Sequence, residues 1–89
     1  MVARRGGLSS TFDELNKYFT ICQMPIVSST YWNSVHGAKP QEAELDLEGM
    51  QVMRNLALNM TFLMKAIALG KKEYGLPAKE KKIATNFIR

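Results

Sequence analysis

The chain has 89 residues, a formal net charge of +4, one cysteine and one histidine. This length suits one small domain, and a hydrophobic content of 46% indicates a folded chain rather than a disordered one. A lone Cys22 excludes an intramolecular disulfide, and Cys22 with a lone His36 leaves too few soft ligands for a zinc site within one chain.

The charge and hydropathy patterns limit the partners that we expect. No unbroken run of about 18 to 20 apolar residues predicts a membrane span, and residues 1–5 lack the apolar run of a secretory signal. We therefore expect a cytoplasmic protein without a membrane partner. Lysine clusters at 71–72 and 79–82 invite a nucleic-acid interpretation, but solvated helix ends and a charged tail explain them better. We expect no nucleic-acid partner.

The first part of the chain predicts a strand and then a helix. Residues 1–3 predict the stub of a strand, which two glycines follow. Thr11 and Glu14 have the spacing of a capping box, and apolar residues recur at helical spacing after them. They predict a helix over about 11–23, which Pro25 ends because it disfavours helical geometry in the residue before it.

The second part predicts a strand, a loop and one long helix. Residues 26–31 are rich in β-branched side chains and predict a strand, so the first 31 residues form a β–α–β unit of an α/β fold. A loop over 32–39 leads to Pro40, a favoured first helical residue. Helical character over about 40–74 predicts one long helix, and a charged tail over 75–89 closes the chain.

The predicted long helix has two apolar surfaces. Five residues form a stripe that we expect to face a core: Met53, Leu56, Met60, Leu63 and Ile67. Four others fall off this stripe: Val52, Leu58, Phe62 and Leu69. The helix would be about 50 Å long, too long for so small a partner layer, so we expect contact with another subunit through the second surface or through the overhanging end of the helix.

Two segments hold candidate binding residues. After the first strand, the backbones of Gly6 and Gly7 allow close approach of a flat ligand, and Arg4 and Arg5 suit a phosphate such as that of NADPH. A basic terminus followed by a flexible glycine pair fits this pattern equally well.

The loop over 32–39 holds the other candidates. Trp32, with Tyr31 beside it, suits stacking on a flavin; two aromatics that fill a junction between loop and core are the alternative. His36 suits a hydrogen bond to a cofactor or a proton relay, or else a structural hydrogen bond. The serines near His36 have no carboxylate motif or nucleophile elbow, so the sequence identifies no catalytic residue.

Several short pieces occur in one order and together resemble the C-terminal part of the NADPH-dependent FMN reductases of the flavodoxin-like superfamily. They cover nearly the whole chain: Ala3-Arg4-Arg5-Gly6-Gly7, Thr11 to Phe19, Met24 to Ser29, Tyr31-Trp32-Asn33 with His36-Gly37, Glu48-Gly49-Met50, and Thr85 to Arg89.

This resemblance implies a fold, cofactors and a site. The fold would be the last two strands and helices of a doubly wound, five-stranded parallel sheet. The activity would be hydride transfer from NADPH to FMN and on to an acceptor. Carried over by motif, four residues would contact the flavin or the nicotinamide: Arg4, Arg5, Gly6 and Gly7. Three others would lie near the flavin of the same or a neighbouring subunit: Trp32, Asn33 and His36.

The resemblance leaves out the phosphate-binding loop that follows the family's first strand, which has no counterpart in these 89 residues. A helix N-terminus at that loop supplies much of the grip on FMN in such folds, so we expect the chain alone to be inactive. We expect a homo-oligomer, or a complementary chain that supplies the missing strands. The alternative function is a non-enzymatic helical oligomerisation or interaction module.

Overall fold

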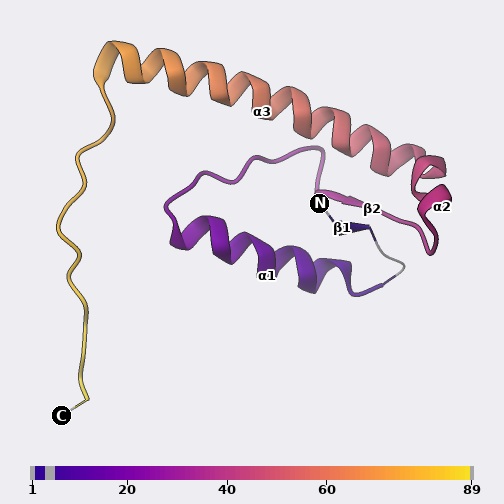
Figure 1. The fold of residues 1–89 in the computed structure, drawn as a ribbon, viewed down its shortest axis with the longest axis horizontal. Helices are drawn as coiled ribbons and strands as arrows, with labels where there is room; N and C mark the ends of the chain where they lie inside the picture. The colour runs from indigo at the N-terminus through magenta and orange to yellow at the C-terminus, as the bar shows by residue number, and fades with distance from the viewer. Residues whose placement is uncertain (1, 4–5, 89) are drawn as a thin grey trace.

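The structure, a computed structural model, describes residues 2–3 and 6–88. Along the chain the elements are β1 (Val2–Ala3), α1 (Leu8–Ile21), β2 (Ser34–Val35), α2 (Pro40–Leu45) and α3 (Leu47–Tyr74). The described chain is therefore mainly helical, and α3 is its longest element (Figure 1).

The two strands pair in parallel and lie between α1 and α3 (Figure 1). Val2 is aligned with Ser34 and Ala3 with Val35, while α1 contacts β1 and α3 contacts β2. The order strand, helix, parallel strand is the one that the sequence predicts. The wider prediction of a flavodoxin-like α/β sheet is not confirmed, because a pair of two-residue strands is the whole sheet in the part of the chain that the structure describes.

The second strand was predicted at 26–31, and this position is wrong. That segment forms no strand, and β2 follows it at Ser34–Val35. Three asparagine side chains bind the segment in place of a neighbouring strand: Asn33 Nδ2 donates to the Val27 carbonyl at 3.0 Å, Asn59 Nδ2 to the Ser28 carbonyl at 2.8 Å, and Asn55 Nδ2 to Thr30 Oγ1 at 2.8 Å. Side-chain amides thus meet part of the hydrogen-bonding demand of this backbone.

Helix α1 begins at Leu8, earlier than the predicted start at Thr11. Its N-cap is Gly7 with φ 71°, a left-handed conformation that suits glycine. The Thr11 hydroxyl donates to the Gly7 carbonyl at 2.9 Å, so Thr11 lies within the first turn and caps nothing. The helix ends at Ile21, before the predicted end at residue 23. Gln23, with φ 57°, then turns the chain away from the helix.

The helix predicted over 40–74 is broken at Asp46 into α2 and α3. Pro40 begins α2 as expected. The break forms because Asp46 leaves helical geometry, with ψ 83°, and its Oδ1 accepts a hydrogen bond from the Gly49 N–H at 2.9 Å. Aspartate is among the preferred N-cap residues, so it begins a new helix here.

The buried core is very small. Val35 and Val52 are its two apolar members among the described residues, with Ser34 buried beside them. Val52 was predicted to fall off the core-facing stripe of α3, yet it is the most buried side chain, because α3 meets β2 through its first turns. Met60 and Ile67, predicted in the core, are 42% and 48% exposed.

The described chain is also open in shape. Its radius of gyration is 17.6 Å, against about 12 Å for a compact domain of this length. Helix α3 extends well past the strands (Figure 1). By length and composition alone it is long and apolar enough to cross a membrane, a criterion that core helices of soluble proteins also meet.

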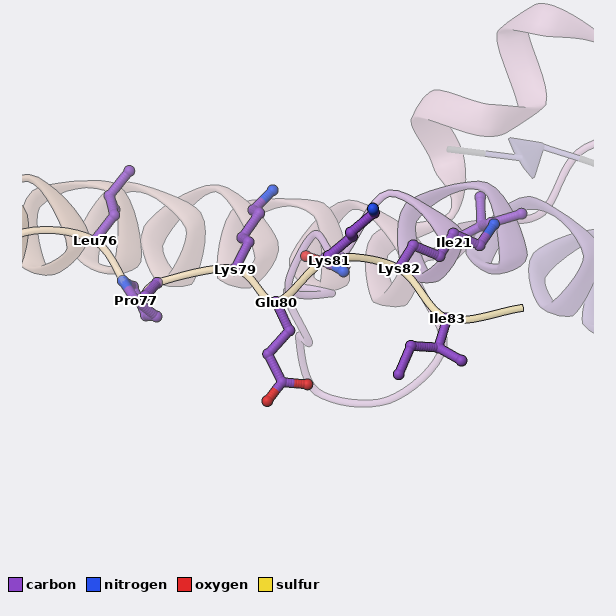
Figure 2. Close-up of a pocket in the computed structure, with 10 residues that line it drawn as sticks. Ile21, Leu76, Pro77, Lys79, Glu80, Lys81, Lys82 and Ile83 are labelled. Carbon is purple, nitrogen blue, oxygen red and sulfur yellow. The ribbon is translucent and has the colours of Figure 1, made fainter. Parts of the chain in front are cut away.

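The C-terminal arm, which we define as residues 76–88, has no helix or strand. Gly75, with φ 72°, ends α3, and the arm runs away from the body of the molecule (Figure 1). Figure 2 shows its first half, from Leu76 to Ile83, passing the end of α1. The space between them, about 850 Å³, is bordered on the α1 side by Ile21 and Gln23 and is otherwise lined by the arm, so the arm covers little of its own chain.

We expect Gly49→Ala to destabilise the fold. A Cβ there would fall on the Asp46 carboxylate and 3.0 Å from the Val35 Cα, so either the cap or the strand must move. Such overpacking costs about 1–3 kcal/mol, which urea unfolding followed by circular dichroism would measure.

Gly70→Ala is the matched control, because a Cβ at Gly70 has nothing within 4 Å. It lies in the same helix and should stabilise the chain by up to about 1 kcal/mol through helix propensity. Equal effects of the two substitutions would contradict the close approach at Gly49.

Candidate functional site

The candidate site lies at the carboxyl edge of the strand pair, which we define by Gly6, Gly7, His36 and Gly37. Because β1 and β2 are parallel, the segments that follow them leave from the same edge. Gly6 and Gly7 follow β1, and His36 and Gly37 follow β2. Ligands of open α/β sheets bind outside the carboxyl ends of the strands.

The Asp46 carboxylate fixes the β2 side of this edge. One of its oxygens, Oδ2, accepts a hydrogen bond from the backbone N–H of His36 at 2.7 Å. The other, Oδ1, accepts from the Gly49 N–H at 2.9 Å and so caps α3. One side chain therefore joins the end of β2 to the start of α3.

These hydrogen bonds shift the titration of Asp46. The backbone N–H of Gly49, then that of His36, lowers the pKa of the Asp46 carboxyl below its ordinary value, and partial burial opposes the shift. Both N–H groups donate to the ionised form and stabilise it. Asp46 is therefore a fixed negative charge at neutral pH.

The imidazole of His36 is the chemically versatile group at the edge. Its Nδ1 lies 3.4 Å from Asp46 Oδ2, and its side chain is 57% exposed. The carboxylate favours a proton on Nδ1, which leaves Nε2 to accept a hydrogen bond when the ring is neutral and to donate one when it is protonated. Asp46 thus orients the imidazole of His36, and the exposed part of the ring is open to a ligand.

The loop after His36 is held in a tight shape beside a shallow hollow. Glu42 Oε2 accepts from the backbone N–H groups of Ala38 at 2.8 Å and Lys39 at 3.2 Å. A Cβ at Gly37 would lie 2.9 Å from the Ala43 nitrogen, so this position needs glycine. His36, Gly37, Ala38 and Glu42 line a hollow of about 470 Å³, open to solvent.

The predicted residues after β1 fall into two groups. Arg4 and Arg5 lie outside the described residues. Gly6 is exposed, and a Cβ there would meet nothing within 4 Å, so its backbone is open to a ligand. Gly7 is the N-cap of α1, and its carbonyl accepts two hydrogen bonds from Thr11.

The predicted residues of the second loop are divided by β2. Trp32 and Asn33 precede the strand, at its amino end, while His36 follows it. The Asn33 amide binds the Val27 carbonyl, and its buried Oδ1 has no hydrogen-bond partner within the described chain. The Trp32 ring packs edge-on against Tyr31, with 5.4 Å between centroids. The strand therefore separates Trp32 and Asn33 from His36.

Tyr31 is tied electrostatically to the start of α3. Partial burial, then the charge and hydrogen bond of the Glu48 carboxylate, raises the pKa of the Tyr31 phenol above its ordinary value. The phenol is therefore protonated at neutral pH.

Asp46 was missed as a positioning residue, although its sequence context holds a signal. Asp46 precedes Leu47-Glu48-Gly49, and an aspartate three residues before a glycine N–H is a plausible N-cap for a helix with an acidic first turn. The contacts of Asn55 and Asn59 were also missed. Their i, i+4 spacing places both amides on one face of α3.

We expect Asp46 to make stability depend on acid pH. Because its pKa is lowered in the folded chain, its contribution is complete above the ordinary carboxyl range and is lost as pH falls through the folded pKa. Between about pH 5 and pH 2, the urea midpoint of the wild type should therefore fall more steeply than that of Asp46→Asn.

The matched control is Asp13→Asn, at the chain's other aspartate, which is exposed on α1. It should keep the wild-type slope. A control slope that falls together with that of Asp46→Asn would contradict the role given to the Asp46 carboxylate.

No protein-family model matches the chain, and neither a curated protein nor a solved structure matches it. What the carboxyl edge binds is therefore inferred from its own residues.

Proposed function

We propose that the chain is the C-terminal part of an NAD(P)H-dependent FMN reductase or related flavodoxin-like oxidoreductase. Its carboxyl edge would lie against the isoalloxazine ring of FMN. The observation that carries the proposal is the parallel β1–α1–β2 unit, which sends the Gly6-Gly7 and His36-Gly37 segments out from one edge. Two helices flank the strand pair, as in half of a doubly wound sheet.

The chemistry of the edge is compatible with a flat, hydrogen-bonding ring. The exposed backbone at Gly6 permits close approach, and the exposed imidazole of His36 can donate to or accept from a ring heteroatom. Asp46 holds the imidazole in place from behind. When bound, FMN would supply the redox chemistry, while these residues would bind and orient its ring.

Among the residues that the structure describes, the edge has no dedicated phosphate-binding group, which limits the affinity for FMN. The phosphate-binding loop of the family has no counterpart in these residues, so the ring and a few hydrogen bonds must supply the binding energy. We therefore propose weak flavin binding by this chain and no reductase activity without the rest of such a fold.

Two unique side chains make the test direct, because the chain has one histidine and one tryptophan. In a proton NMR titration with FMN, the His36 imidazole signals should move, with saturation at high-micromolar to millimolar FMN. The Trp32 indole signal should move less, because Trp32 lies on the other side of β2. His36→Ala should weaken binding by about tenfold, the loss of one hydrogen bond of about 1.4 kcal/mol.

Tyr74→Ala, at the far end of α3, is the control and should leave the FMN affinity unchanged. Unmoved His36 signals at saturating FMN would count against the proposal. A response from Trp32 alone would place any flavin at the amino edge instead.

A further inference from the structure

Helix α3 carries an outer apolar stripe that its own chain leaves open. Its members are Leu58, Phe62 and Leu69, spaced by four and seven residues and so on one face of the helix. Phe62 is 70% exposed, and the other two are similarly open. By helix geometry the stripe lies about 80–120° around the helix from Val52, the buried side chain that faces β2.

The two ends of α3 carry opposite charge together with exposed apolar residues. At the N-terminal end, the acidic patch comprises Glu42, Glu44 and Glu48 with the exposed Leu45 and Leu47. At the C-terminal end lie Lys71 and Lys72, and the arm adds Lys79, Lys81 and Lys82 with the exposed Ile83. The carboxylates of one end would therefore complement the lysines of the other end in charge.

The acidic patch and the arm lie apart within one chain, because the arm passes Ile21 and Gln23 at the end of α1. Helix α3 has 28 residues and is therefore about 42 Å long. Its arm leaves from the end opposite to α2 (Figure 1). The structure does not use the charge complementarity of these two surfaces within one chain, so it is available between two copies.

The exposed area exceeds what a folded monomer of this size presents. The surface of the described chain is 8157 Å², whereas a folded chain of 10.0 kDa exposes about 5,200 Å². The surplus is larger than the roughly 800 Å² per partner that a standard stable interface buries. The chain thus has enough unburied surface to form a substantial interface.

From these observations we propose that α3 pairs with α3 of a second copy in an antiparallel, two-fold symmetric dimer. The outer stripes face each other, with Leu58 of one copy opposite Leu69 of its partner and the two Phe62 rings near the symmetry axis. Each arm then lies along the acidic patch of the other copy.

The antiparallel direction follows from the charges. A parallel pair would set acidic patch against acidic patch and arm against arm, and like charges at an interface are unfavourable. The antiparallel pair sets acid against lysine twice, and it closes as a dimer because both copies use the same surface. This inference does not rest on flavin binding, since the stripe and the arm contain none of the carboxyl-edge residues, although Glu42 of the acidic patch also lines the hollow beside His36.

The dimer is tested by the mass of the full chain in light scattering after gel filtration, with Phe62→Glu as the disrupting variant. The wild type should be a dimer at micromolar concentration. Phe62→Glu should raise the dissociation constant by at least about 30-fold, the effect of losing one interface hot spot. Because Phe62 is exposed, the helical circular dichroism signal should not change.

Met64→Glu is the matched control. Met64 is about as exposed as Phe62, and Met64→Glu introduces the same charge as Phe62→Glu. Because Met64 is two residues farther along the helix, its side chain lies about 200° around the helix from Phe62. It should remain a dimer. A monomeric wild type, or equal dissociation by both variants, would overturn the proposal, as would binding of α3 to lipid vesicles with no dimer in solution.

The arm contact is tested by reversing charge on both sides. Lys81→Glu with Lys82→Glu should weaken the dimer by about tenfold at low salt and by less at high salt. Glu44→Lys alone should also weaken it. In the arm-reversed chain, Glu44→Lys should instead strengthen the dimer, because the two reversals restore opposite charges. Additive weakening would overturn the antiparallel arrangement.

Discussion

The Asp46 carboxylate is the interaction on which the other parts of this small fold depend. It caps α3 through Gly49 and holds the end of β2 through the His36 N–H, while its imidazole contact orients the one histidine. The hydrogen bonds are charge-assisted and therefore stronger than neutral ones. A chain with only two buried apolar side chains in its described part has few other ways to hold a strand against a helix.

The rest of the body is joined in the same manner, by polar side chains rather than by an apolar core. Asn33, Asn55 and Asn59 bind the extended segment at Val27 to Thr30, and Glu42 binds the loop after β2. Such links fix geometry well but contribute modest net stability. The apolar surface that would normally supply stability remains outside, on α1, α3 and the arm, and part of it is the surface that the proposed dimer would bury.

The sequence predicts the parts of this fold that depend on local signals. Pro40 at the start of a helix and Gly75 at the end of one were found, as was the order strand, helix, parallel strand. The position of β2 was not predicted, because residues 26–31 have the stronger β propensity. Ser34 and Val35 form the strand instead, since they pair with β1 and contact α3. Likewise, Val52 is the buried residue because α3 crosses β2 there. The helical periodicity of the sequence does not encode the position of that crossing.

The candidate site shows the same division. Gly7 and His36 were singled out by residue type, and the parallel strands bring their segments to one edge. Asp46 was not singled out, since its role arises from a hydrogen bond to a residue ten positions earlier. Trp32 and Asn33 were grouped with His36 through the motif resemblance, and the two residues of β2 lie between them and His36.

The hydrogen bonds of Asp46 join residues that come late in the described sequence, and this affects the order in which the chain folds. Strand β1 is made before its partner β2, which comes some thirty residues later, and neither Asp46 nor Gly49 has yet been made when β2 is complete. During synthesis α1 can form from local contacts alone, whereas the strand pair has no clamp until the first turn of α3 exists. Until then the amino-terminal strand has an open edge, and it is available to any other strand that reaches it first.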